Sequence, residues 1–217
     1  MSAPVGSLRD LQDLLEGRGS YVFEQRPFPY YSVLMYAPTN GLNKLLHEYV
    51  SSHYELFNSQ TGPNWLVAVI EDIGRDRSIE ESSRPQDVYD IARYLGARVD
   101  DIPALVFFTD PQERNETLIL RLGDILPESS NITDEILTDL FGRIAAIIDD
   151  LSPASISPDV RLSRLRDALG REWPKDSKWG GWARNAVGWL KVSATTATSV
   201  IGALDNVARL LKAISIY

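Results

Sequence analysis

The chain has 217 residues, of which 44% are hydrophobic and 24% are charged, so its composition is that of a globular protein and excludes disorder along the whole chain. It contains no cysteine, which excludes disulfides, cysteine-ligated zinc and any chemistry that needs a thiol. Its net charge of −8 is uneven, because residues 1–150 carry 25 acidic and 12 basic side chains whereas residues 151–217 carry 5 and 10. This asymmetry predicts two parts with different surfaces: either a basic tail rests on an acidic body, or the tail meets something anionic.

The first 27 residues predict a helix and a short strand. Leucines recur at helical spacing within residues 7–16, and Ser7 is a typical N-cap residue for that helix. Residues 20–25 predict the strand. Because no apolar leader precedes the helix, we expect no signal peptide and a cytoplasmic protein.

The next segment alternates between strand and helix patterns. Residues 30–37 predict a buried strand, and residues 41–53 predict a helix with an apolar inner face. The apolar run at residues 65–72 is typical of a central strand, and the polar residues 73–84 that follow it predict a loop.

A helix and a hairpin follow this loop. The helix is expected at residues 85–96, where Pro85 opens it and Gly96 ends it. Two further apolar runs, at residues 102–108 and 116–122, are separated by a turn-like polar segment. Their pattern indicates a β-hairpin.

The last helix of the body is expected at residues 133–151, with Thr133 as its N-cap. The element order is then that of an α/β domain over residues 28–151, with a mixed sheet flanked by helices. Proline and serine at residues 152–158 predict a linker. The remaining region, 159–217, is expected to be all-α, with helices at about 159–171, 180–191 and 193–215.

Two motifs in the body resemble those of a known fold. The run "YYSVLMYAPTNGLNK" leads from a strand into a helix, and "IPALVFF" places an Ile-Pro step before a strand. With the element order from residue 30 to about residue 150, these motifs resemble the thioredoxin fold, over about 120 of the 217 residues. The resemblance implies that Pro103 is a cis-proline facing the N-terminus of the helix that begins near Gly41.

The motif departs from the family at the positions that carry its chemistry. Thioredoxins have two cysteines at the start of this helix, and Asn40 and Asn43 stand in their places here. The acid that the family buries in the preceding strand is Leu34, and the residue after the Ile-Pro step is Ala104 rather than threonine. Because asparagine cannot form a thiolate, we expect dithiol exchange to be absent.

Two interpretations of this helix start remain open. Thr39 and Asn40 are good N-cap residues, whose side-chain oxygens accept hydrogen bonds from free backbone N–H groups, so capping alone accounts for them. In the functional interpretation, the helix start and the Ile-Pro loop form a shallow peptide-docking groove. The residues of this groove are Thr39, Asn40, Asn43, Ile102 and Pro103.

The C-terminal region concentrates tryptophan and basic residues. Four of the five tryptophans lie between residues 173 and 189, and from Leu190 onward apolar residues recur at steps of three and four, as in an amphipathic helix. An uncharged run of 13 residues, 192–204, is shorter than the ~20 that span a bilayer. The apolar seam is expected to meet the protein's own core or a second copy, a partner chain, or a membrane surface. Candidate residues of this tail interface are Trp173, Trp179, Trp182, Trp189, Leu190, Ile201, Leu204 and Leu211.

Other site types find little support in the sequence. The isoelectric point of about 4.8 and the lack of a dense Arg/Lys stripe argue against nucleic-acid binding. His47 and His53 lie on different faces of one helix, so we expect neither a metal nor a cofactor. The pairs Asp100–Asp101 and Asp149–Asp150 lie at the ends of elements, where solvation accounts for them.

Three functions of different classes follow. The first is a non-catalytic thioredoxin-like module for protein interaction, whose amphipathic tail mediates assembly through self-association or a partner protein. The second is a membrane-acting effector, in which the Trp- and Lys-rich tail contacts anionic lipid at the membrane periphery. The third is an enzyme similar to glutathione transferases, suggested by "LPESSNI" (126–132), although this motif lies 25 residues beyond Pro103.

Overall fold

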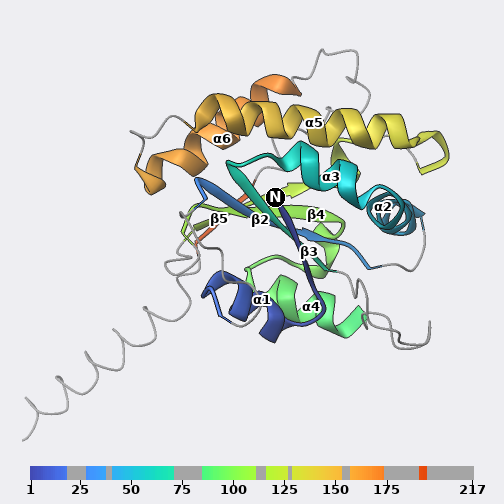
Figure 1. Cartoon of the computed structure of the whole chain (residues 1–217), viewed down its shortest axis with the longest axis horizontal. Coiled ribbons are helices and arrows are strands. Elements are labelled where there is room, and N and C mark those ends of the chain that lie inside the picture. Colours follow the sequence, from blue (N-terminus) through green and yellow to red (C-terminus); the bar gives the residue numbers. More distant parts are fainter. Residues whose placement is uncertain are drawn as a thin grey trace, which may run out of the picture.

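The chain folds into a mixed β-sheet with helices on both faces (Figure 1). The computed structural model describes residues 1–18, 28–37, 41–70, 85–110, 116–126, 129–152, 157–173 and 191–194. Within them, the strands are β1 (Ser2–Val5), β2 (Tyr30–Met35), β3 (Trp65–Ile70), β4 (Ala104–Phe108), β5 (Glu116–Arg121) and β6 (Lys191–Ala194). The α-helices are α1 (Leu8–Leu15), α2 (Gly41–Ser52), α3 (Tyr54–Thr61), α4 (Pro85–Tyr94), α5 (Asp134–Leu151) and α6 (Pro158–Glu172).

The strands are arranged in the order β1-β3-β2-β4-β5-β6. β1, β3 and β2 run parallel, whereas β4 lies antiparallel to β2, β5 to β4 and β6 to β5. Every residue of β2 and β3 is buried, which requires that both faces of the sheet be covered. The predicted α/β class with a mixed sheet is confirmed.

The two faces of the sheet carry separate hydrophobic clusters. Alternation along β2 sends Leu34 into the cluster under α2, α3, α5 and α6, and sends Val33 and Met35 into the cluster under α1 and α4. Figure 1 shows these two groups of helices above and below the sheet. Because side chains alternate along this fully buried strand, β2 contributes to both hydrophobic layers.

The N-terminal segment differs from the sequence expectation. Residues 2–5 form β1, which pairs with β3 with Ser2 opposite Val67, so residues that the sequence placed outside the sheet-bearing domain belong to the sheet. The strand was missed because "SAPV" contains a proline and has weak β-propensity, and only its partner strand identifies it. The expected helix is confirmed as α1, and the Ser7 hydroxyl caps it by accepting a hydrogen bond from the Asp10 N–H. The strand predicted at 20–25 lies outside the described residues.

The single helix predicted at 41–53 is followed directly by another. α2 ends at Ser52, His53 leaves helical geometry at φ −123° and ψ 28°, and α3 begins at Tyr54. α3 was missed because it is mostly polar. Phe57 is its fully buried anchor, and its ring packs edge-on against the Phe141 ring of α5 at a centroid distance of 4.9 Å.

The predicted hairpin and the helices that flank it agree with the structure. β4 and β5 pair antiparallel, with Ala104 opposite Arg121. Gly96 follows α4 with φ at 77°, the left-handed conformation that glycine adopts without steric cost at helix ends. The Thr133 hydroxyl accepts the Ile136 N–H at 3.4 Å and so caps α5 as expected.

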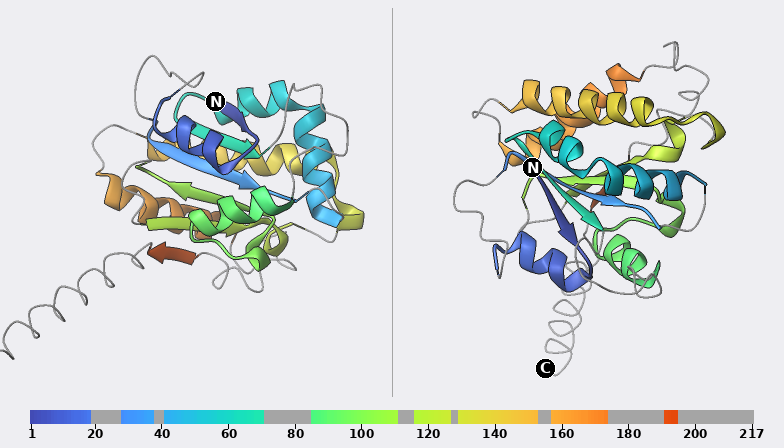
Figure 2. Two further views of the ribbon diagram at one scale, coloured as in Figure 1. Left: turned by 90° about the horizontal axis from the view of Figure 1, so that it is seen from below. Right: turned by 45° about the vertical axis from the view of Figure 1, so that its right-hand side comes forward.

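The region after residue 152 agrees with the sequence expectation only at its start. α6 lies within one residue of its predicted bounds and packs on α5. The helices expected at 180–191 and 193–215 lie outside the described residues except at 191–194, where β6 pairs with β5 (Figure 2). Residues 191–194 form a strand because the edge of β5 offers backbone partners, which periodicity along the tail does not reveal.

Candidate functional site

The predicted docking groove lies where β2 ends and α2 begins. Met35, the last residue of β2, stands opposite Ala104 in the antiparallel ladder, so the Ile102–Pro103 step lies beside the end of β2. The peptide bond between Ile102 and Pro103 is cis, as expected from the sequence. Pro103 is buried, whereas Ile102 remains half-buried.

Asn43 supports the chain that enters α2. Its side-chain oxygen accepts a hydrogen bond from the backbone N–H of Ala37 at 3.1 Å. This bond ties the first turn of α2 to the end of β2. Asn43 therefore has a defined structural role. Two other polar candidates of the groove lie outside the described residues, namely Thr39 and Asn40.

Two positions near Asn43 that the resemblance marks as chemically important, Leu34 and Ala104, hold apolar residues. Leu34, which stands where thioredoxins bury an acid, is fully buried and apolar. Ala104, after the cis-proline, is also fully buried. The first turn of α2 carries no acidic residue. These described residues can bind through shape, apolar contact and backbone groups.

A buried carboxylate fixes the loop that precedes Pro103. Asp101 is 2% exposed, and its Oδ2 accepts the Arg98 N–H at 3.0 Å. Arg121, at the end of β5, lies 3.9 Å from Asp101 Oδ1 and pairs more closely with Asp124, with Nε 2.7 Å from Oδ2. The interpretation of the Asp100–Asp101 pair as solvated is therefore wrong for Asp101, which is a positioning residue for this loop.

Apolar side chains lie on the outside of the same loop. Val99 is 55% exposed, and the neighbouring Ile102 and Tyr94 are half-buried against the cluster under α1 and α4. The N–H of Ile102 donates to the carbonyl of Val99 at 3.1 Å, which keeps these two residues in one short turn. The loop thus presents a small apolar surface, and the buried Asp101 side chain keeps the loop in place. We call Val99 and Ile102 the loop surface.

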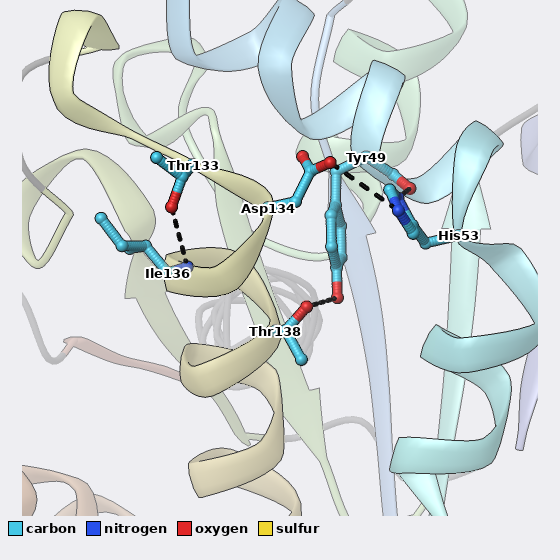
Figure 3. A network of polar contacts seen from close by, with 6 residues as sticks. All are labelled: Tyr49, His53, Thr133, Asp134, Ile136 and Thr138. Carbon is cyan, nitrogen blue, oxygen red and sulfur yellow. Dashed lines mark hydrogen bonds and ion pairs between the residues drawn. The ribbon is translucent and has the colours of Figure 1, made fainter.

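A second polar cluster joins α2, α3 and α5 (Figure 3). His53 lies between α2 and α3, with Nε2 3.7 Å from Asp134 Oδ2 and Nδ1 3.3 Å from the Tyr49 carbonyl oxygen. The Tyr49 hydroxyl shares a hydrogen bond of 3.0 Å with Thr138 Oγ1 on α5. Both groups that face the His53 ring are acceptors, so the ring can donate to both only when it is protonated.

The aromatic ring of Tyr49 forms the centre of this cluster. It stacks on the His53 ring at 5.2 Å and on the Phe141 ring at 5.9 Å. Burial raises the pKa of the Tyr49 hydroxyl above its ordinary value, and the hydrogen bond with Thr138 opposes part of that shift. The cluster therefore connects α2, α3 and α5 through polar and aromatic contacts. The sequence does not predict this cluster, because no local pattern connects His53 with Asp134.

The candidate tail interface is described at one residue. Trp173 is 2% exposed and belongs to the cluster under α5 and α6, so it packs in the protein's own core. The other candidates of that interface lie outside the described residues: Trp179, Trp182, Trp189, Leu190, Ile201, Leu204 and Leu211.

Among the described residues, no group of three or more histidine, aspartate and glutamate side chains could hold a metal ion. The helices in the described part of the chain lack the combined length and apolar character needed to cross a membrane. Comparisons with models of protein families, with curated proteins and with solved structures found no match.

Proposed function

We propose that this chain is a redox-inactive, thioredoxin-like module for protein interaction. The observation that carries the proposal is the position of Asn43, whose amide oxygen is bound to the Ala37 N–H. The resemblance places one of the family's two cysteines at this position. The amide keeps the strand-to-helix junction in place and supplies no redox chemistry.

Two features of the fold support the thioredoxin-like part of the proposal. From β2 to α5 the chain has the order of strands and helices on which the resemblance rests, except that α3 follows α2 directly. The cis bond before Pro103 lies at the start of β4, where the resemblance expects it. Fold alone does not determine function, so the site carries the functional argument.

The loop surface supports the interaction part of the proposal. Val99 and Ile102 stand beside the start of β4, and the buried Asp101 holds their turn in place. When a partner covers an exposed apolar group on a rigid loop, the free energy of the complex falls. Little of this gain is lost to ordering the loop, because the loop is already fixed. The site therefore suits the docking of a protein segment better than catalysis.

The test is a comparison of captured partners. Full-length protein, an Ile102→Glu variant and a Leu56→Glu variant are immobilised and exposed to native lysate. Leu56 is the matched control because it is an apolar residue 42% exposed on α3. We expect the same partners on the wild type and the control and their loss from Ile102→Glu. Equal capture by all three proteins would contradict docking at the loop surface.

The proposed assembly role of the tail needs a chain shortened at the right residue. A cut near residue 152 would remove Leu162, Leu165 and Leu169 from the core, so the cut belongs after Trp173. At equal concentration, we expect sedimentation velocity to show fewer chains per particle for residues 1–173 than for the full chain. Identical association states would rule out assembly through residues beyond Trp173.

A further inference from the structure

The β5 edge of the sheet is covered by a strand from the far end of the chain. β6 pairs with β5 in antiparallel register, with Glu116 opposite Ala194 and Ile119 opposite Lys191. The pairing covers four positions of a six-residue strand. The outer edge of β5 is therefore occupied, but only by a short segment.

β5 is held in place by contacts other than those with β6. Leu118 and Leu120 belong to the cluster under α5 and α6, and Ile119 belongs to the cluster on the opposite face. The buried Thr117 hydroxyl donates to the Leu95 carbonyl at the end of α4 at 3.3 Å. Together with the ladder to β4, these contacts fix the backbone of β5 as an edge that is ready to accept a strand.

The strand that occupies this edge is short. Four paired residues supply only a few ladder hydrogen bonds, and the entropy lost in ordering each residue offsets much of the stabilisation that these bonds provide. Residues 174–190, a connection of 17 residues, separate β6 from the end of the core at Trp173. Such a segment competes for the β5 edge mainly because it is tethered close to it.

We propose that the outer edge of β5 is a strand-acceptor site for an extended peptide segment, and that residues 191–194 occupy it as a built-in competitor. An incoming segment would pair antiparallel with β5, as in the recognition of peptides by added β-strands. The register places Val192 opposite Leu118, so an apolar residue belongs at that position of the ligand. Displacement of β6 would free residues 191–194 from the sheet at the same time.

The experiment uses a labelled synthetic peptide of residues 189–196 as the probe and the full-length chain as the receptor. A Val192→Pro/Ser193→Pro variant weakens β6, because successive N–H groups of a strand point to opposite sides and the double change removes the one directed at β5. A Glu116→Cys/Ala194→Cys variant, joined by a short bis-maleimide, locks β6 in place. Since the chain has no other cysteine, the link forms only at this pair.

We expect fluorescence anisotropy to show at least about tenfold tighter peptide binding to the proline variant than to the wild type, and no binding to the linked variant. A scrambled peptide and the unlinked cysteine variant are the controls, and circular dichroism checks that each variant is folded. The proposal is overturned if the proline variant binds the peptide no better than the wild type. It is equally overturned if the linked variant binds as tightly as the unlinked one.

Discussion

The side-chain oxygen of Asn43 and the backbone nitrogen of Ala37 lie 3.1 Å apart, so a single hydrogen bond joins the first turn of α2 to the end of β2. Asn43 is half-buried, which limits the access of water to this bond. The contact explains why a polar residue that can accept a hydrogen bond stands at this position.

The first prediction concerns that bond. We expect Asn43→Ala to lower the free energy of unfolding by about 1 kcal/mol, because the Ala37 N–H loses its acceptor. Asn43→Asp keeps an acceptor near the start of a helix and should retain nearly all of the stability. Urea unfolding of the three proteins provides the measurement, and equal losses in both variants would contradict this role of the amide oxygen.

The second prediction tests the resemblance to thioredoxin. We expect the thiols of an Asn40→Cys/Asn43→Cys variant to react with iodoacetamide faster at neutral pH than ordinary exposed thiols, because a helix N-terminus stabilises a thiolate. The matched control is Arg164→Cys/Asp167→Cys, with the same spacing on the exposed middle of α6. If both pairs react at the same rate, the helix start does not have the electrostatics of a thioredoxin site.

The third prediction concerns the attachment of α6. Leu165 is fully buried in the cluster that α6 shares with α5, so we expect Leu165→Ala to cost about 2–5 kcal/mol. Arg164→Ala, on the exposed side of the same helix, should change the free energy of unfolding by less than about 0.5 kcal/mol. Chemical denaturation followed by circular dichroism and by tryptophan fluorescence should give coincident transitions. Separate transitions would show that α6 unfolds independently of the body.

The fourth prediction concerns alkaline pH. Burial raises the pKa of Tyr30, Tyr31 and Tyr49 above the ordinary value of 10.0. The folded protein therefore holds these protons more tightly than the unfolded chain, so the stabilisation is complete below pH 10 and is lost as the pH rises above that value. Phenolate absorbance during a pH titration should show these tyrosines ionising later than tyrosine in the urea-unfolded chain. Simultaneous ionisation in both states would contradict the prediction.

The fifth prediction concerns His53 and Asp134. Their side chains are 36% and 66% exposed, so solvent screens the ion pair and we expect a coupling energy of only about 0.2–1 kcal/mol. A double-mutant cycle with His53→Gln and Asp134→Asn measures this energy. Added salt should reduce it further, whereas a coupling that salt does not change would point to a non-ionic contact between the two side chains.

The sequence predicted those parts of the fold in which local pattern and tertiary environment agree. β2, β3, β4 and β5 arise from short, continuous apolar runs. Such runs indicate strands that are buried on both faces, and helices do cover both faces of this sheet. β1 could not be predicted, because Ala3 and Pro4 form a strand only through pairing with β3. α3 was equally hidden, since Phe57 is the single large apolar anchor of a mostly polar segment.

The candidate site was also predicted only in part. The cis bond at Pro103 was implied by the resemblance, whereas Asn43 was named only as a groove residue, without its bond to the Ala37 N–H. The burial of Asp101 does not follow from the sequence, because its partners are the Arg98 N–H and, 20 residues further along the chain, Arg121 at the end of β5. Contacts between residues far apart in the chain produce no periodic pattern in the sequence.

The contact between the start of β2 and α6 has a consequence for synthesis on the ribosome. The Tyr30 hydroxyl donates to the Arg161 carbonyl at 3.4 Å, and Trp173 completes the cluster to which Tyr30 belongs. Translation proceeds from the N-terminus, so this side of the core stays open until the end of α6 has emerged. Nascent chains halted at residue 151 should consequently recruit chaperones that bind apolar segments, and chains extended past Trp173 should release them.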